Sequence, residues 1–173
     1  YFHFNNSNYN YSYSNMDGNT AFSSKGANIA FSRGMIVVVS AGNSGNTANP
    51  NISAPSDATF ALAVGAVNSA RNYASFSSIG PSFDGRVKPD VMAQGQSSVV
   101  AMPSGDIAVN SGTSFSGPII AGMVASFWQA LPNLTNARIV QLVKESSSRY
   151  NNPNVQFGYG IPNFQLALNT ALE

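Results

Sequence analysis

The stretch that most constrains the fold is a polar turn that leads directly into an apolar segment, residues 110–131, which reads NSGTSFSGPIIAGMVASFWQAL. The pattern predicts a helix that begins close to Ser114. We expect Pro118 in its first turn, since the missing proline N–H would have no intrahelical partner there. Residues 119–131 are apolar on nearly all sides, which predicts a helix enclosed by a sheet or by other helices. The chain is therefore expected to form a layered fold around this helix.

Ser114 would stand at the N-terminus of that helix. Backbone N–H groups there lack intrahelical acceptors, and the positive end of the helix dipole suits a site that holds developing negative charge. A buried helix also places the serine rigidly, as a nucleophile requires. These features make Ser114 the candidate nucleophile.

A second unit precedes this helix in the chain. Residues 21–33 are compatible with a helix, and Gly34 is well placed to end it in the left-handed conformation. Met35–Ser40 is a continuous, largely β-branched run, which predicts a strand covered on both faces. A helix, a glycine and a buried strand in this order form a crossover unit, so we predict an α/β fold with a mostly parallel sheet.

Asn43 follows that strand in the turn Ala41-Gly42-Asn43. Ligands of open α/β sheets bind at the carboxyl ends of the strands, which makes Asn43 a candidate site residue. The alternative is that Asn43 only tolerates a left-handed turn conformation, as many asparagines do. The residues alone leave both interpretations open.

The remaining elements follow from local patterns. They are a strand at 60–67, a hairpin formed by 97–102 and 107–109, a helix capped by Asn133 or Thr135 and reaching Ser147, and a helix over 164–172 capped by Asn163. We expect residues 74–95 to wrap the sheet rather than join its centre. No internal repeat or linker is found, so residues 1–173 are treated as one domain.

Composition narrows the function classes. The net charge is +1 and only 9% of residues are charged, so no basic surface for nucleic acid is expected. The longest apolar run falls short of a membrane span of about 20 residues. Cysteine is absent, which excludes disulfides, thiol nucleophiles and thiolate metal sites. The abundance of Asn, Ser, Gly and Tyr is typical of secreted proteins, and we expect an extracellular or cell-envelope location.

The first twenty residues read as a loop with aromatic anchors. His3 is the only histidine of the chain, but it lies two residues from the chain end and in no recognisable motif. A general base needs fixed geometry that a terminal segment seldom supplies, so we do not assign His3 as the base.

Three motifs now coincide: Ala-Gly-Asn after a buried strand, Gly-Thr-Ser at residues 112–114 before a buried helix, and a proline four residues beyond Ser114. Together they resemble the subtilisin-like serine proteases, the subtilases. The resemblance implies a three-layer αβα fold, with Ser114 as nucleophile and Asn43 as a donor to the oxyanion hole. It places Ser40, Ala41 and Gly42 along the primary substrate pocket, and the Gly-Thr-Ser match adds Thr113 to the candidate substrate-binding residues.

The aspartate and histidine motifs of the family are missing from this sequence. The resemblance therefore implies a serine endopeptidase acting through an acyl-enzyme, to which this chain contributes the nucleophile and oxyanion hole but not the Asp and His of the triad. We expect Tyr1 to lie inside a catalytic domain, with an N-terminal segment of that domain, on the same or a separate chain, completing the sheet beside residues 35–40. The isolated chain is expected to be inactive. The alternative is a catalytically inert binding or structural module with the same fold.

The expected substrate is a polypeptide, and no cofactor is required. Calcium is left open as a structural ion without named ligands, because scattered aspartates form no loop-type cluster. An α/β-hydrolase is excluded, since Ser116 stands where the second glycine of its nucleophile elbow belongs.

Overall fold

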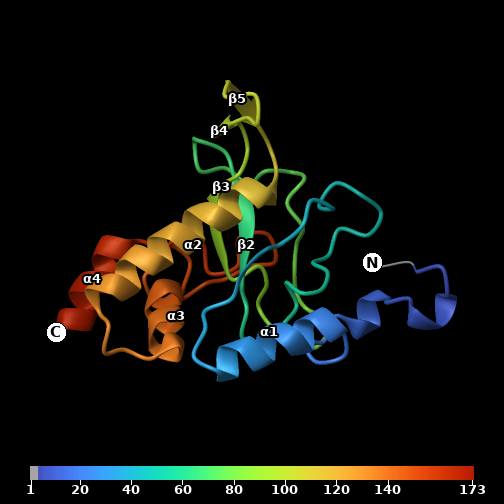
Figure 1. Ribbon diagram of the computed structural model, residues 1–173, viewed down its shortest axis with the longest axis horizontal. Coiled ribbons are helices and arrows are strands. Elements are labelled where there is room, and N and C mark those ends of the chain that lie inside the picture. The colour runs from blue at the N-terminus through green and yellow to red at the C-terminus, as the bar shows by residue number, and fades with distance from the viewer. Residues whose placement is uncertain (1–3) are drawn as a thin grey trace.

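The computed structural model describes residues 4–173. A parallel sheet of three strands lies at its centre, in the order β1 (Val38–Ser40), β2 (Leu62–Val67) and β3 (Val91–Gln94). Every residue of β2 is buried, as expected for a central strand with helices on its faces. The predicted parallel sheet is confirmed (Figure 1).

The helix α2 (Thr113–Ala130) lies across one face of this sheet and contacts all of its strands. Its buried apolar residues are Ile120, Val124 and Phe127. The helices α3 (Asn136–Glu145) and α4 (Phe164–Leu172) pack against α2 and extend the same core. Figure 1 shows α3 and α4 gathered around the C-terminal end of α2.

The helix α1 (Phe22–Ser32) packs on the opposite face. Its buried Ala27 belongs to a cluster with Val37 and Val39, whereas Val38 packs into the cluster beneath α2. Because successive side chains of a strand point to opposite faces, this alternation places a helix on each side of β1. The layers are thus helix, sheet and helix, and the predicted three-layer fold class is confirmed.

Helix ends agree with the local predictions. Gly34 has φ +90°, and the N–H of Met35 reaches the carbonyl of Ala30 at 3.2 Å, closing α1 with a left-handed cap. The side chain of Thr135 accepts from the Arg138 N–H at the start of α3, and Asn163 caps α4 in the same way. Short polar side chains at these positions satisfy N–H groups that the helix cannot.

Two expectations about α2 are wrong. The helix begins at Thr113, so Pro118 lies in its second turn rather than its first. Only one side of the helix is buried in the described chain, because the sheet, α3 and α4 cover that side alone. The other side exposes apolar residues, among them Ile119 at 46% and Met123 at 43%.

The strand predicted over Met35–Ser40 is also shorter and less covered than expected. The strand covers only Val38–Ser40, and each of these residues is half-buried. The reason is the position of β1 at one end of the strand order: within residues 4–173 it pairs with β2 alone.

The segment 74–95 does not merely wrap the sheet, because it ends in β3, which pairs with β2 from Val64 opposite Val91 onward. The prediction missed this strand because two charged residues, Lys88 and Asp90, directly precede the short apolar run, although both are only 2% exposed.

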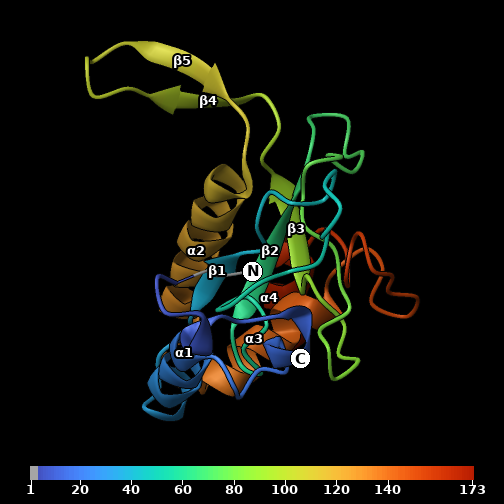
Figure 2. The same ribbon diagram turned by 90° about the vertical axis from the view of Figure 1, so that its right-hand side faces the viewer.

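The hairpin prediction is confirmed by β4 (Ser98–Ala101) and β5 (Ile107–Asn110), which pair antiparallel. Figure 2 shows this hairpin standing away from the body of the molecule above the start of α2. None of the helices within the described residues is both long and apolar enough to cross a membrane.

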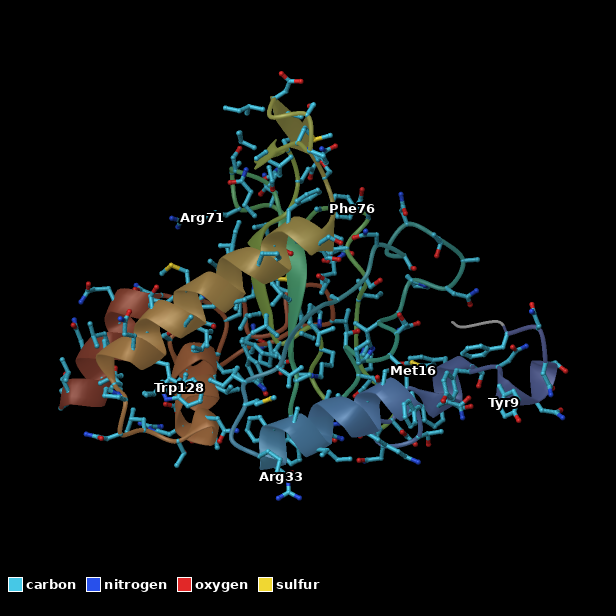
Figure 3. All side chains as sticks on the ribbon, in the orientation of Figure 1. Tyr9, Met16, Arg33, Arg71, Phe76 and Trp128 are labelled. Carbon is cyan, nitrogen blue, oxygen red and sulfur yellow. The ribbon has the colours of Figure 1, made fainter. Side chains whose placement is uncertain are left out.

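The N-terminal loop contains two short 3₁₀ turns, η1 (Ser7–Tyr9) and η2 (Tyr13–Asn15). Met16 follows them and is fully buried against Ala21 and Ala54, with two tyrosines packed alongside. Figure 3 shows Met16 at the end of this loop, where the chain enters α1. For residues 4–20, the predicted loop with aromatic anchors is confirmed.

Candidate active site

Ser114 occupies the second position of α2 and is exposed. The N–H groups on either side of it are used, that of Thr113 by Asn43 and that of Phe115 by the carbonyl of Gly112. The N–H and the hydroxyl of Ser114 have no hydrogen-bond partner within residues 4–173. Ser114 therefore combines an exposed hydroxyl with a free N–H at the positive end of a long helix.

Asn43 is held beside this residue by its side-chain oxygen. Oδ1 accepts from the N–H of Thr113 and from its hydroxyl, each at 2.9 Å. A backbone N–H can only donate, so the oxygen must be the atom that faces α2, and the NH₂ group points elsewhere. A Cβ on Gly112 would lie 3.5 Å from Nδ2, which places that group along the approach to Ser114. The Nδ2 group of Asn43 thus lies near Gly112, two residues before Ser114.

Thr113 connects the two segments. It is 1% exposed, and its hydroxyl accepts from the N–H of Gly42 at 3.2 Å while donating to Asn43. Its carbonyl accepts from the hydroxyls of Ser40 at 2.9 Å and Ser116 at 3.1 Å. With its side chain buried, the geometry favours a positioning role for Thr113, and direct contact with substrate stays a prediction.

The last residue of β1 and the turn after it contain the other predicted pocket residues. Ser40 and Gly42 are half-buried, whereas Ala41 is fully buried and its N–H donates to Val64 in β2. Gly42 has φ +107°, and a Cβ at this position would lie 2.8 Å from the hydroxyl oxygen of Ser78. Only glycine satisfies both conditions, so the turn depends on this residue type.

Ser78 is a supporting residue that the sequence analysis did not assign. Its N–H donates to the carbonyl of Gly42, and its hydroxyl accepts from the N–H of Ser44. The neighbouring Gly45 donates to the carbonyl of Phe76, which Figure 3 places near the start of α2. The run of small polar residues at 74–78 was the available signal, but the contact spans more than thirty positions and no local pattern reveals it.

Close approach between α2 and the sheet depends on Gly95 and Gly117. A Cβ on Gly95 would lie 2.7 Å from that of Ala66 and 2.8 Å from the carbonyl oxygen of Gly112. A Cβ on Gly117 would meet the hydroxyl of Ser40 at 3.0 Å. These glycines let the start of α2 rest on the ends of the strands, which brings Ser114 to Asn43.

Residues 4–173 contain no histidine, and His3 lies outside the described residues. A general base of the imidazole type is therefore not supplied by the described part of the chain. The same residues contain no group of three or more His, Asp or Glu side chains that could hold a metal ion. A calcium site built from backbone carbonyls stays a prediction.

Fold and site together define an α/β protein in which an exposed serine at the start of a helix lies close to an asparagine in the turn after a parallel strand. The sequence profile of the Subtilase family matches residues 4–160. The chain belongs to the subtilase family of serine proteases.

Individual relatives agree with this assignment. The chain is 36% identical to "Subtilisin" of Bacillus pumilus over 139 residues. This matched stretch makes up 80% of this chain and 48% of the relative. It is 35% identical to "Subtilisin NAT" of Bacillus subtilis subsp. natto, over 80% of this chain and 35% of the relative. The chain thus spans half or less of the length of these relatives.

Among solved structures, the fold is similar to one described as "Structure of self-cleaved protease domain of PatA". The TM-score is 0.71 at 23% identity, covering 84% of this chain and 53% of that one. At this identity the likeness concerns the fold alone.

Proposed function

We propose that this chain supplies the nucleophile and the oxyanion hole of a serine endopeptidase. The observation that carries the proposal is the orientation of Asn43: its oxygen is held by Thr113, so its NH₂ group is free to donate beside the exposed Ser114. The unpaired N–H of Ser114 is the second donor. Oxyanion holes need such donors fixed in advance where negative charge develops.

In the proposed reaction, Ser114 Oγ attacks the carbonyl carbon of a peptide bond and gives its proton to a general base. The carbonyl oxygen becomes negatively charged and accepts from Asn43 Nδ2 and from the Ser114 N–H. The intermediate then collapses to an acyl-enzyme as the amine leaves with a proton, and water hydrolyses the ester. Ser40 and Gly42 would line the pocket for the substrate side chain, and the fully buried Ala41 between them would hold the turn in place.

The Asp and His of the triad would come from a segment outside this sequence, on the same or on a separate chain. Two surfaces support this proposal. Within residues 4–173, β1 pairs along one edge only, and the outer side of α2 exposes Ile119 and Met123. Both are costly to leave in water, and a segment that adds a strand and a helix would cover them. The isolated chain should then be inactive, because its serine lacks a base.

The protein is proposed to act outside the cell or in the cell envelope, on polypeptide substrates. No cofactor is needed for the chemistry, and calcium would serve only as a structural ion held by backbone carbonyls.

Labelling with a fluorophosphonate tests the proposal. In the protein that includes the base-bearing segment, the probe should modify Ser114, and Ser114→Ala should abolish the modification. Ser111→Ala, which changes another exposed serine just before α2, is the matched control and should keep the labelling. Modification of a different serine, or none, would contradict the proposed nucleophile.

The alternative is an inert subtilase-like binding or structural module. The observation that favours it is the lack of any histidine in residues 4–173. The two functions separate on the same labelling experiment, because an inert module binds its partners without reacting with the probe.

A further inference from the structure

A small pocket lies at the end of the sheet opposite to Ser114. Thr59 and Phe60, which line it, precede β2, whereas Asn43 follows β1. Since the strands are parallel, these positions mark opposite ends of the sheet. The pocket has a volume of about 280 Å³ and lies between α1 and α3, which Figure 1 shows at the lower end of the molecule.

Two aromatic pairs form its walls. Phe31 of α1 stacks on Phe60, with ring centroids 5.0 Å apart and planes 7° from parallel. Tyr150 lies against Tyr159 at 5.7 Å. Phe60 is 49% exposed and Tyr150 41% exposed, although each carries a large apolar surface. Exposed aromatic rings that converge on one hollow are characteristic of a site for a ring-containing ligand.

A positive charge lies between these walls. Lys144 of α3 is 25% exposed, and its Nζ lies 5.7 Å from the ring centre of Tyr159. It bonds to Oδ1 of Asp90 at 2.5 Å, and within residues 4–173 it has no other acceptor. One ammonium with unused donors therefore faces an aromatic pocket.

The charge of Lys144 is not balanced by its partner. Oδ2 of the buried Asp90 also accepts from Lys88 Nζ at 2.7 Å and from the Ala63 N–H at 2.8 Å. Lys88 donates in addition to the carbonyl of Ala61, so two of its three N–H groups have acceptors. Two ammonium groups share one carboxylate, which leaves the cluster with one excess positive charge.

The next carboxylate on α3 does not neutralise this charge. Glu145 bonds to Arg138 at 3.1 Å and to the side-chain amide of Gln141 at 2.7 Å. The excess charge at Lys144 is thus available to an anion from solution, and charge-assisted bonds to a carboxylate are stronger than neutral ones.

We propose that this pocket binds a small aromatic monocarboxylate. The ring would lie between the Phe31/Phe60 and Tyr150/Tyr159 pairs, and the carboxylate would accept from Lys144. The volume lies just under the usual range for ligand pockets, about 300–1,000 Å³, which favours a single small molecule. This site is separate from the proposed active site and does not depend on the proposed function.

Calorimetric titration of the Ser114→Ala protein with phenylacetate tests the proposal. Phenylacetate should bind at least roughly tenfold more tightly than 2-phenylethanol, which lacks the charge, and than acetate, which lacks the ring. Equal affinities for phenylacetate and 2-phenylethanol, or no binding of phenylacetate at millimolar concentration, would overturn it.

Variants locate the binding. Lys144→Gln should weaken phenylacetate binding by roughly tenfold, while Lys25→Gln, on the exposed side of α1, should leave it unchanged. Because Lys144→Gln also alters the Asp90 cluster, Phe60→Ala provides an independent test: it removes a half-exposed ring and should weaken binding with the cluster intact. Unchanged affinity in Phe60→Ala would place the ligand elsewhere and refute the proposal.

Discussion

At the scale of single residues, the proposed chemistry depends on the amide of Asn43. Asn43→Leu keeps the size of the side chain but removes the donor, so stabilisation of the oxyanion is lost while substrate binding is retained. We expect kcat to fall by about 10²–10³, the magnitude known for this donor in subtilisin, with KM little changed. Steady-state kinetics on a peptide substrate, in the protein that includes the base-bearing segment, measure both constants. Asn46→Leu in the same loop is the control, and a KM effect without a kcat effect would argue against the assigned donor.

Thr113 is expected to act through Asn43. Thr113→Ala removes the hydroxyl that bonds to Asn43 and Gly42, so the amide loses one of its two anchors. Because small misplacements of catalytic groups are costly, we expect kcat to fall by roughly 10- to 100-fold. Thr113→Ser keeps the hydroxyl and should restore most of the activity. If both variants were equally impaired, packing of the methyl group, not the hydroxyl, would be responsible.

At the scale of elements, the site depends on how closely α2 rests on the sheet. Gly95→Ala would place a Cβ 2.7 Å from that of Ala66, so the strand end or the helix must move. We expect a loss of about 1–3 kcal/mol in the free energy of unfolding. Gly26→Ala in α1 meets no atom within 4 Å and should instead stabilise by about 0.5–1 kcal/mol. Urea unfolding of both variants measures these free energies. If Gly95→Ala and Gly26→Ala changed the free energy of unfolding by similar amounts, the close approach of α2 to the sheet would not be limiting.

Elements specified by neighbouring residues could be predicted from the sequence, and those specified by distant contacts could not. Asn163 and Gly34 were recognised because caps follow from the few residues beside them. The strand β3 was missed because its pairing with β2 and the burial of Asp90 are long-range features. At the candidate site, the motifs point to Asn43 and Ser114, but the bonds that orient Asn43 come from Thr113, seventy positions away.

At the scale of the whole molecule, the cluster around Asp90 ties α3 to the central sheet. Burial alone would raise the pKa of Asp90, but the charges of Lys88 and Lys144 hold it below its ordinary value of 3.8. The unfolded chain therefore takes up a proton before the folded one as the pH falls. The resulting stability is present above pH 3.8 and is lost as the pH falls through the lower folded pKa.

Replacing this carboxylate should have a large effect. Asp90→Asn leaves Lys88 buried without a countercharge, and we expect a loss of about 3–5 kcal/mol at pH 7. The acid-dependent part of stability should shrink as well. Thermal unfolding followed from pH 7 to acid measures both effects, with Asp106→Asn in the exposed hairpin turn as control. A variant with the same stability and acid profile as the parent would show that the cluster is not coupled to folding.

The central claim is that Asn43 and the Ser114 N–H hold the oxyanion during attack by Ser114. A crystal structure of the protein with a fluorophosphonate bonded to Ser114 tests it most directly. We expect one phosphonyl oxygen about 2.7–3.1 Å from both Asn43 Nδ2 and the Ser114 nitrogen. An adduct whose oxygens all point away from Asn43, or an adduct on another serine, would contradict the account.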